Sequence, residues 1–289
     1  LDQIAVQPTP YRERLGALVF DDDVLDQRGR RTRPRLKPGW SPSRLLEDDY
    51  IGNAVWLNRA AVRQVGGFSS DYRFYFLLDL LLRLDEAGYL IDKQDVVDLH
   101  RSATSTDIVD PQEQERLIRA RTVRIGGTLE EVEHRAHVTR PRYRVGDALV
   151  SVIIPFRDRV DLLRQCVGSI FGKTNFPNYE LLLVNNQSAE LETDTYLRSL
   201  ATQSGVRIIR YDKPFNYSRL NNFAAQHARG SILIFLNNDT EVISADWMDQ
   251  LAGDASQPGI GAVGAMLYFA DGTIQHGGVV VGLNGLAGH

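Results

Sequence analysis

The 289-residue chain has a single cysteine, Cys166, and no long apolar run. One cysteine excludes an internal disulfide bond and suits a reducing compartment. No apolar run approaches the ~18 residues of a membrane span, so any membrane contact is expected to be peripheral. The expected compartment is therefore the cytoplasm, with the inner face of the plasma membrane as the alternative.

The chain also lacks an excess of positive charge, because its formal net charge is −4. Nucleic-acid backbones are bound through clustered lysines and arginines, so we expect no nucleic acid as a partner. Apolar residues make up 43% of the chain, which is enough for the core of one large α/β domain or two modest ones.

From residue 151 onward, short apolar runs alternate with segments of helical periodicity. The runs show no alternation of apolar and polar residues, which is typical of strands that are covered on both faces. They span residues 151–155, 180–184, 206–211 and 231–236. This order predicts an α/β fold with a Rossmann-like, doubly wound parallel sheet.

The first part of the chain has a different pattern. Residues 1–105 predict a mixed α+β segment with a strand over 16–20, a helix that begins at Ser41-Pro42 and an apolar helix over 76–84. Residues 106–150 predict a charged, structured linker with a helix over 111–124 and a strand over 142–145. The expected domains are therefore 1–105, 106–150 and 151–289.

The two ends of the chain resemble each other. Residues 1–5 are similar to residues 248–252, and Phe20 with the acids after it parallels Phe269 and Asp271. Self-similarity at a fixed spacing indicates duplicated units. The chain starts without methionine or a signal-peptide pattern and stops inside a continuing pattern. We therefore expect a piece of a longer protein, with the second half of one unit followed by the first half of the next.

The most informative stretch is residues 231–239, where an apolar strand changes abruptly into Asn237, Asn238 and Asp239. In open α/β sheets, ligands bind just beyond the carboxyl ends of parallel strands. A carboxylate at that place can hold Mg²⁺ or Mn²⁺ against a diphosphate. The stretch therefore points to a nucleotide-sugar enzyme, although Asn237 and Asn238 alone also fit ordinary turn chemistry.

Four motifs carry a resemblance to a known family. They lie at residues 152–159, 184–188, 220–222 and 236–241, in the order seen in glycosyltransferase family 2. Residues 271–276 resemble the bacterial branch that builds O-antigen and other surface polysaccharides, which includes rhamnosyltransferase-like proteins that often carry two such units. Residues 36–41, 66–68, 79–83 and 99–101 resemble the acceptor-side half of the same unit.

The resemblance implies a GT-A fold that binds a nucleoside-diphosphate sugar, such as a UDP- or dTDP-sugar, and passes the sugar to a glycan or lipid-linked acceptor. Asp239 would bind the metal. Relatives usually place an aspartate that contacts the base where this chain has Asn185, so the base preference stays open. The residues implied in nucleotide-sugar binding are Pro155, Arg157, Asp158, Asn185, Ser188, Asn221, Asn237, Asn238 and Asp239.

The resemblance also implies inversion by a general base, which relatives take from an acidic pair just before an Asp-Leu dipeptide. This chain has Leu77 at that position, and a leucine accepts no proton. We therefore name no catalytic base, and two functions stay open. One is an inverting, metal-dependent glycosyltransferase, and the other is a non-catalytic module that binds a nucleotide sugar and positions a partner enzyme. A nucleotidyltransferase lacks support, because no glycine-rich basic loop follows the first strand.

Several residues have a plain structural interpretation beside a functional one. The repeat aligns residues 21–23 downstream of the metal turn, which favours a solvated turn over an Asp-x-Asp metal site. Asp158 also suits a helix N-cap, and Asp79 with Arg83 suits an intrahelical ion pair. His100 is a candidate for metal or phosphate contact, and Cys166 is expected to pack in the core.

Overall fold

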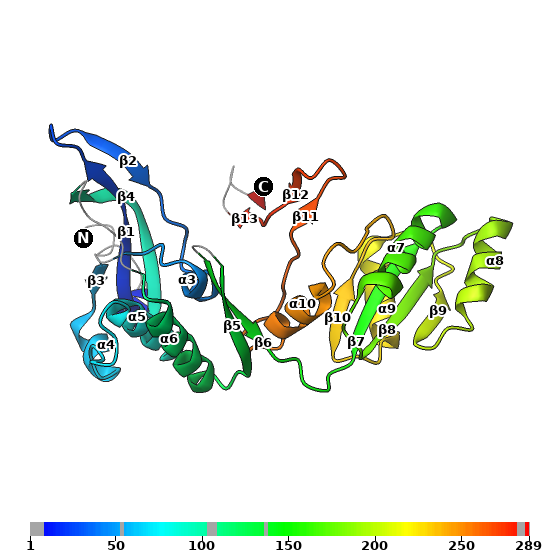
Figure 1. The fold of residues 1–289 in the computed structure, drawn as a ribbon, viewed down its shortest axis with the longest axis horizontal. Coiled ribbons are helices and arrows are strands. Elements are labelled where there is room, and N and C mark those ends of the chain that lie inside the picture. Colours follow the sequence, from blue (N-terminus) through cyan, green and yellow to red (C-terminus); the bar gives the residue numbers. More distant parts are fainter. Residues whose placement is uncertain (1–8, 53–54, 103–108, 136–137, 282–286, 289) are drawn as a thin grey trace. The chain divides into compact units, whose positions relative to one another are not determined.

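A computed structural model describes residues 9–52, 55–102, 109–135, 138–281 and 287–288. The chain divides into two compact units, unit 1 (Leu1–Arg142) and unit 2 (Tyr143–His289) (Figure 1). The repeat segment at residues 1–5 lies outside the described residues. Each unit has its own sheet and its own hydrophobic core, and each is described by itself below.

Unit 1 is built around the long strand β1 (Leu15–Leu25). This strand pairs antiparallel with β2 (Arg31–Arg35) and β3 (Val55–Leu57), and parallel with β4 (Leu90–Ser102). Unit 1 contains both helices and strands, as expected for residues 1–105, but it extends to Arg142 and so includes most of the expected linker. Its other elements are α2 (Thr9–Arg14), α3 (Pro42–Glu47), α4 (Arg59–Gln64), α5 (Phe76–Glu86), α6 (Pro111–Arg124), β5 (Leu129–Arg135) and β6 (Val138–Tyr143).

Helix α5 makes the largest contribution to the core of unit 1, because all of its leucines are buried. Helix α6 adds Leu117 and Ile118 to the same cluster, so the segment expected as a linker contributes to this core. Asp110 caps α6, because its side chain accepts the N–H groups of Gln112 and Glu113. Across the described ranges, no helix combines the length and the apolar character needed to cross a membrane.

Unit 2 contains the predicted parallel sheet, in the strand order β10-β7-β8-β9 (Figure 1). The Rossmann-like α/β prediction is confirmed, and the strand bounds shift by a residue or two. The strands are β7 (Val150–Phe156), β8 (Tyr179–Asn185), β9 (Val206–Arg210) and β10 (Ile232–Phe235). The helices are α7 (Val160–Lys173), α8 (Leu191–Leu200), α9 (Tyr217–His227) and α10 (Trp247–Ala255), followed by β11 (Leu267–Tyr268), β12 (Ile274–His276), β13 (Val280–Val281) and β14 (Ala287–Gly288).

Helices cover both faces of this sheet, as the unbroken apolar strands require. Val152 and Ile154 of β7 pack in one cluster with α7 and α10, whereas Ile153 packs in another with α9. This alternation follows from the two-residue period of a strand. Because both faces are dry, the carboxyl edge of the sheet is where polar side chains can meet a ligand.

The loop before β10 passes very close to β7. A Cβ atom added to Gly230 would lie 2.4 Å from the Leu149 oxygen and 2.7 Å from the Ser151 nitrogen. We expect Gly230→Ala to destabilise unit 2 by about 1–3 kcal/mol, because backbone atoms must move apart. The matched control is Gly168→Ala at an exposed position of α7, where an added Cβ meets nothing within 4 Å and should stabilise the helix by roughly 0.5–1 kcal/mol. Urea unfolding of both variants checks the two signs, and a stable Gly230→Ala protein would contradict the close approach.

The proposed internal repeat places its two copies in different environments. Phe20 of β1 is 4% exposed, whereas its counterpart Phe269, just after β11, is 53% exposed. Leu267, Tyr268 and Ile274 are exposed as well. The similarity in sequence therefore does not extend to a similar packing of these segments.

Candidate donor-binding site

The polar residues that follow three strands of unit 2 lie at one edge of the sheet. The backbone nitrogen of Leu236 donates to the Ile153 oxygen, and that of Asn186 donates to the Phe156 oxygen, both at 2.9 Å. These two hydrogen bonds extend the pairing of β10 with β7, and of β8 with β7, by one residue beyond the ends of β10 and β8. They place the turn after β10 beside the end of β7, and the end of β7 beside Asn185 of β8.

Asp239 lies in the turn directly beyond β10 and is exposed, as is Asn237, while Asn238 is half-buried. The turn is closed by Thr240, whose hydroxyl donates to the Asn237 oxygen at 2.8 Å. No group of three His, Cys, Asp or Glu side chains in the described residues is arranged to hold a metal ion. A single carboxylate still fits Mg²⁺ or Mn²⁺, because these ions fill their shells with phosphate oxygens and water.

The backbone after β7 and β8 is strained. Asp158, Arg159 and Gln187 have φ values of 48°, 47° and 61°, in the left-handed region that residues other than glycine seldom adopt. Such a conformation costs about 1–3 kcal/mol for each residue and persists only where the surroundings hold it in place. Strained residues of this kind are commonly found at ligand sites. Here they lie at the carboxyl edge of the sheet, where the predicted binding residues also lie.

Asp158 acts differently from the N-cap that the sequence predicts. The residue that caps α7 is Arg159, and its side chain makes no capping hydrogen bond. Asp158 instead accepts the N–H groups of Ala189 and Glu190 at 2.8 and 3.0 Å, at the start of α8. Its own N–H donates to the Ser188 hydroxyl at 2.8 Å. The cap prediction is wrong for α7 because the left-handed backbone turns Asp158 toward the neighbouring loop.

Asn185 has its amide orientation set by one neighbour. Its Oδ1 accepts the N–H of Ser188 at 2.9 Å, so the amide NH₂ is the part of this side chain that is left to donate to another group. Ser188 therefore connects the loops after β7 and β8. Pro155 is half-buried in β7, and Arg157 is exposed just beyond it.

Asn221 carries a buried acceptor that lacks a partner. The residue is 6% exposed and its Nδ2 donates to the Tyr217 oxygen at 3.0 Å, but Oδ1 has no partner among the described atoms. One turn later on α9, Ala224 packs with Ile153 of β7. A buried acceptor left unpaired costs about 1–3 kcal/mol, so Asn221 is suited to accept a hydroxyl or N–H group of a ligand.

Asn186, next to Asn185, has a structural role that the sequence did not predict. Its side chain is buried, and its Nδ2 donates to the oxygens of Tyr211 and Lys213, both at 2.9 Å. Asn186 thereby fixes the loop that leads from β9 to α9. The pair Asn185-Asn186 at the end of β8 could have indicated this role. Successive residues of a strand point to opposite faces, so the two amides are expected to have different partners.

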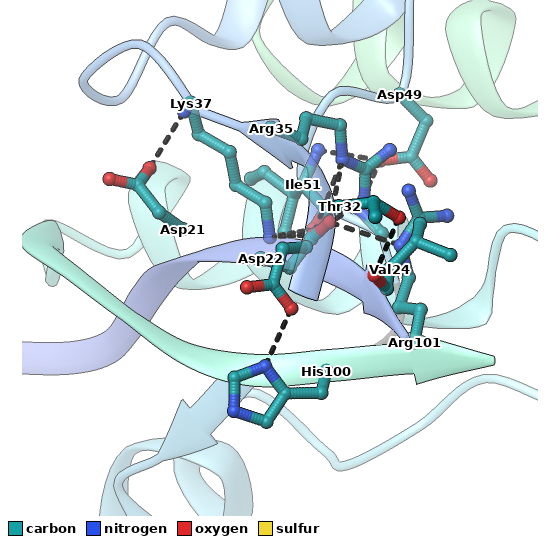
Figure 2. A network of polar contacts seen from close by, with 12 residues as sticks. Asp21, Asp22, Val24, Thr32, Arg35, Lys37, Asp49, Ile51, His100 and Arg101 are labelled. Atoms are coloured by element: carbon teal, nitrogen blue, oxygen red, sulfur yellow. Dashed lines mark hydrogen bonds and ion pairs between the residues drawn. The ribbon is translucent and has the colours of Figure 1, made fainter. Parts of the chain in front are cut away.

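The three acids of residues 21–23 do not form the solvated turn that the repeat suggested. They lie inside β1 and are 3%, 2% and 3% exposed. Figure 2 shows Asp21 and Asp22 among the polar contacts of this region. Asp22 binds Arg35 at 2.8 Å and Lys37 at 3.0 Å. The prediction is wrong because basic side chains from neighbouring segments neutralise the acids. The cations that bind these acids are Arg31, Arg35, Lys37, Lys93 and Arg101, together with His100.

Other predicted residues of unit 1 have structural partners. The His100 Nδ1 lies 2.6 Å from an oxygen of Asp23, so this ring nitrogen is occupied by the acid network. Asp79 forms the predicted ion pair with Arg83, at 2.7 Å. Leu77 is 6% exposed and packs in the core, so the position expected for a general base holds a buried apolar side chain.

Comparison with known proteins identifies the family of unit 2. Residues 151–277 match the family model described as Glycosyl transferase family 2. This part of the chain belongs to that family. The family prediction made from the four motifs is therefore confirmed, and so is the α/β fold class. The rhamnosyltransferase-like detail and the division into half-units stay predictions.

Two relatives match almost the whole chain. O-antigen biosynthesis protein RfbC of Myxococcus xanthus is 39% identical over 95% of this chain and 22% of its own length. Uncharacterized protein y4gI of Sinorhizobium fredii (strain NBRC 101917 / NGR234) is 36% identical over 94% of this chain and 32% of its own length. The chain thus spans a third or less of the length of either relative.

Among solved structures, the mannosyltransferase PcManGT from Pyrobaculum calidifontis, in complex with GDP-Man and Mn²⁺, is similar to this chain. The TM-score is 0.35 and the sequence identity is 19%, over 38% of this chain and 32% of that chain. A similarity of this size carries no argument about the ligand of the family 2 domain.

Proposed function

We propose that the chain is part of an inverting, metal-dependent glycosyltransferase. It takes a sugar from a nucleoside-diphosphate sugar, a UDP- or dTDP-sugar, and transfers it to a growing surface polysaccharide or a lipid-linked acceptor. Unit 2 is the donor-binding half. The observation that carries the proposal is the exposed carboxylate of Asp239, directly beyond β10, which is the neighbour of β7 in the strand order β10-β7-β8-β9.

The proposed chemistry follows from the charge that develops on the leaving diphosphate. A bound Mg²⁺ or Mn²⁺ stabilises this negative charge without proton transfer. Asp239 would hold the metal, with Asn237 and Asn238 beside it. Asn185 would donate its NH₂ group and Asn221 would accept through Oδ1, while Asp158 and Ser188 hold the loops around the nucleotide.

The acceptor class and the compartment are part of the same proposal. The relative in Myxococcus xanthus is named for O-antigen biosynthesis, which supports a polysaccharide acceptor. A lipid-linked acceptor would place the reaction at the inner face of the plasma membrane, with the protein in the cytoplasm. In this proposal unit 1 is the acceptor-side half of a preceding glycosyltransferase unit.

A second candidate function is favoured by Leu77. A buried leucine at the base position cannot take the proton of an acceptor hydroxyl, so unit 1 would support no transfer of its own. The chain would then be a non-catalytic nucleotide-sugar-binding module that positions a partner enzyme.

Calorimetric titration of the chain with UDP- and dTDP-sugars, with and without Mn²⁺, tests both functions. We expect binding of one nucleotide class, with an affinity that falls at least about tenfold when Mn²⁺ is removed. Slow metal-dependent hydrolysis of the donor, followed by chromatography, supports the enzyme. Binding without hydrolysis supports the module, and an absence of binding to all donors contradicts both.

A further inference from the structure

We propose that helix α7 is the element that positions Asp239 for its metal, through side chains that never touch the metal. The positioning residues are Gln165, Cys166, Ser169 and Lys173, which lie along one stripe of the helix. The inference rests on the proposed metal site at Asp239. It assigns the two carboxylates of the turn, Asp239 and Glu241, to different tasks.

Ser169 holds the far end of the turn. Its hydroxyl oxygen accepts the N–H of Val242 at 3.0 Å and donates to the Cys166 backbone oxygen at 2.8 Å. Val242 is 8% exposed and packs in the same core cluster as α7. The chain three residues after Asp239 is thereby fixed to the helix by a hydrogen bond and by burial.

Glu241 is bound by α7 through both of its carboxylate oxygens. Lys173 donates to Oε1 at 2.7 Å and to the Val242 oxygen at 2.8 Å, and Gln165 donates to Oε2 at 2.9 Å. Glu241 is therefore committed to the helix, and Asp239 is the carboxylate of this turn that remains for the metal.

Cys166 holds the near end of the turn. Its sulfur lies 3.7 Å from the Asn237 oxygen and 3.8 Å from the Thr240 hydroxyl, and the residue is 1% exposed. The thiol can donate a weak hydrogen bond to the Asn237 carbonyl.

The turn is thus attached to α7 on both sides of Asp239, while Asp239 itself faces solvent. A metal held by one protein carboxylate is sensitive to that carboxylate's position, because no other protein ligand corrects a displacement. Outer-shell partners of metal ligands commonly contribute ten- to a hundredfold to metal affinity. The helix therefore sets the affinity of the site.

The test uses the whole chain and the variants Ser169→Ala, Ser169→Thr and Lys173→Met. Binding of Mn²⁺ in the presence of UDP is measured from the electron paramagnetic resonance signal of the free ion. We expect Ser169→Ala and Lys173→Met each to raise the Mn²⁺ dissociation constant about tenfold. Ser169→Thr should keep the dissociation constant of the parent chain, because threonine retains the hydroxyl group. The control is Arg164→Met, also on α7, where the arginine pairs with Glu192 at 3.3 Å, away from the turn.

The unfolding midpoint without metal separates positioning from loss of fold. Lys173 is 42% exposed, so its replacement should leave this midpoint nearly unchanged. The inference is overturned if Ser169→Ala and Lys173→Met bind Mn²⁺ within twofold of the parent chain, or if Ser169→Thr fails to restore binding. If Asp239→Asn itself binds Mn²⁺ normally, the proposed function fails instead.

Discussion

Replacing Asp239 by asparagine should lower metal-dependent turnover of the donor by about 100-fold or more. The amide keeps the size of the side chain but removes the negative charge that would hold Mg²⁺ or Mn²⁺. Removal of one preorganised electrostatic contact to a developing charge commonly costs about 10²–10³ in rate. Donor hydrolysis measured over a range of Mn²⁺ concentrations gives the loss directly.

The matched control for this variant is Asp194→Asn. Asp194 is an exposed aspartate in the first turn of α8, and its carboxylate pairs with Arg198 at 2.7 Å. Its replacement should leave both hydrolysis and Mn²⁺ binding unchanged. Equal activity of Asp239→Asn and Asp194→Asn would remove the basis of the proposed function.

Replacing Asp22 by alanine should destabilise unit 1 by about 3–5 kcal/mol. Removal of one partner from a buried ion pair leaves an uncompensated charge in the interior. Here the charge left behind is the Lys37 ammonium, whose side chain is 1% exposed and lies 3.0 Å from Asp22. Its hydrogen bond to the Ile51 oxygen, at 2.6 Å, supplies no opposite charge. Urea unfolding followed by tryptophan fluorescence measures the loss.

Asp95→Ala is the control for this prediction, because it removes an aspartate of the same unit that is almost fully solvated. The Asp95 side chain is 92% exposed, although it pairs with Lys93 at 2.6 Å. Exposed ion pairs contribute about 0–1 kcal/mol, so this variant should unfold close to the parent chain. A small effect of Asp22→Ala, similar to that of Asp95→Ala, would show that the Asp22 network does not stabilise unit 1.

The same network gives unit 1 a defined response to acid. Burial alone would raise the pKa of Asp22, but hydrogen bonds from Arg35 and Lys37 outweigh it and hold the pKa below its usual 3.8. A carboxyl group with a lowered folded-state pKa stabilises the fold above the unfolded-state pKa. That contribution is lost as the pH falls below 3.8 and through the folded-state pKa. Asp22→Asn should therefore show a flatter loss of stability in this range than the parent chain.

Much of unit 2 could be predicted from local pattern. The strands of its sheet are unbroken apolar runs because helices cover both faces of the sheet. The abrupt change to Asn237, Asn238 and Asp239 marks the point where the chain leaves this covered region. Element order then implies the parallel sheet, and the sheet implies which edge carries polar residues. The four motifs add the family, which the match over residues 151–277 confirms.

Contacts between segments that are far apart in the sequence could not be predicted from local pattern. Residues 21–23 appear in the sequence as a polar turn, yet they are strand residues whose countercharges come from β2, β4 and the loop after β2. Asp158 has the spacing of a helix cap, yet it binds the start of α8. In both cases the partner lies far along the chain, and no local pattern identifies it.

The sequence by itself determined the α/β class of unit 2, the position of Asp239 after the last parallel strand and the family of residues 151–277. Tertiary structure alone decided which of two neighbouring amides or acids is hydrogen-bonded by another part of the fold: Asn186, which binds the loop before α9, and Glu241, which binds α7. The reason is physical. Whether a strand is buried can be predicted from the apolar character of its own residues. The hydrogen-bond partner of a polar group, in contrast, depends on which donor or acceptor the fold places next to it.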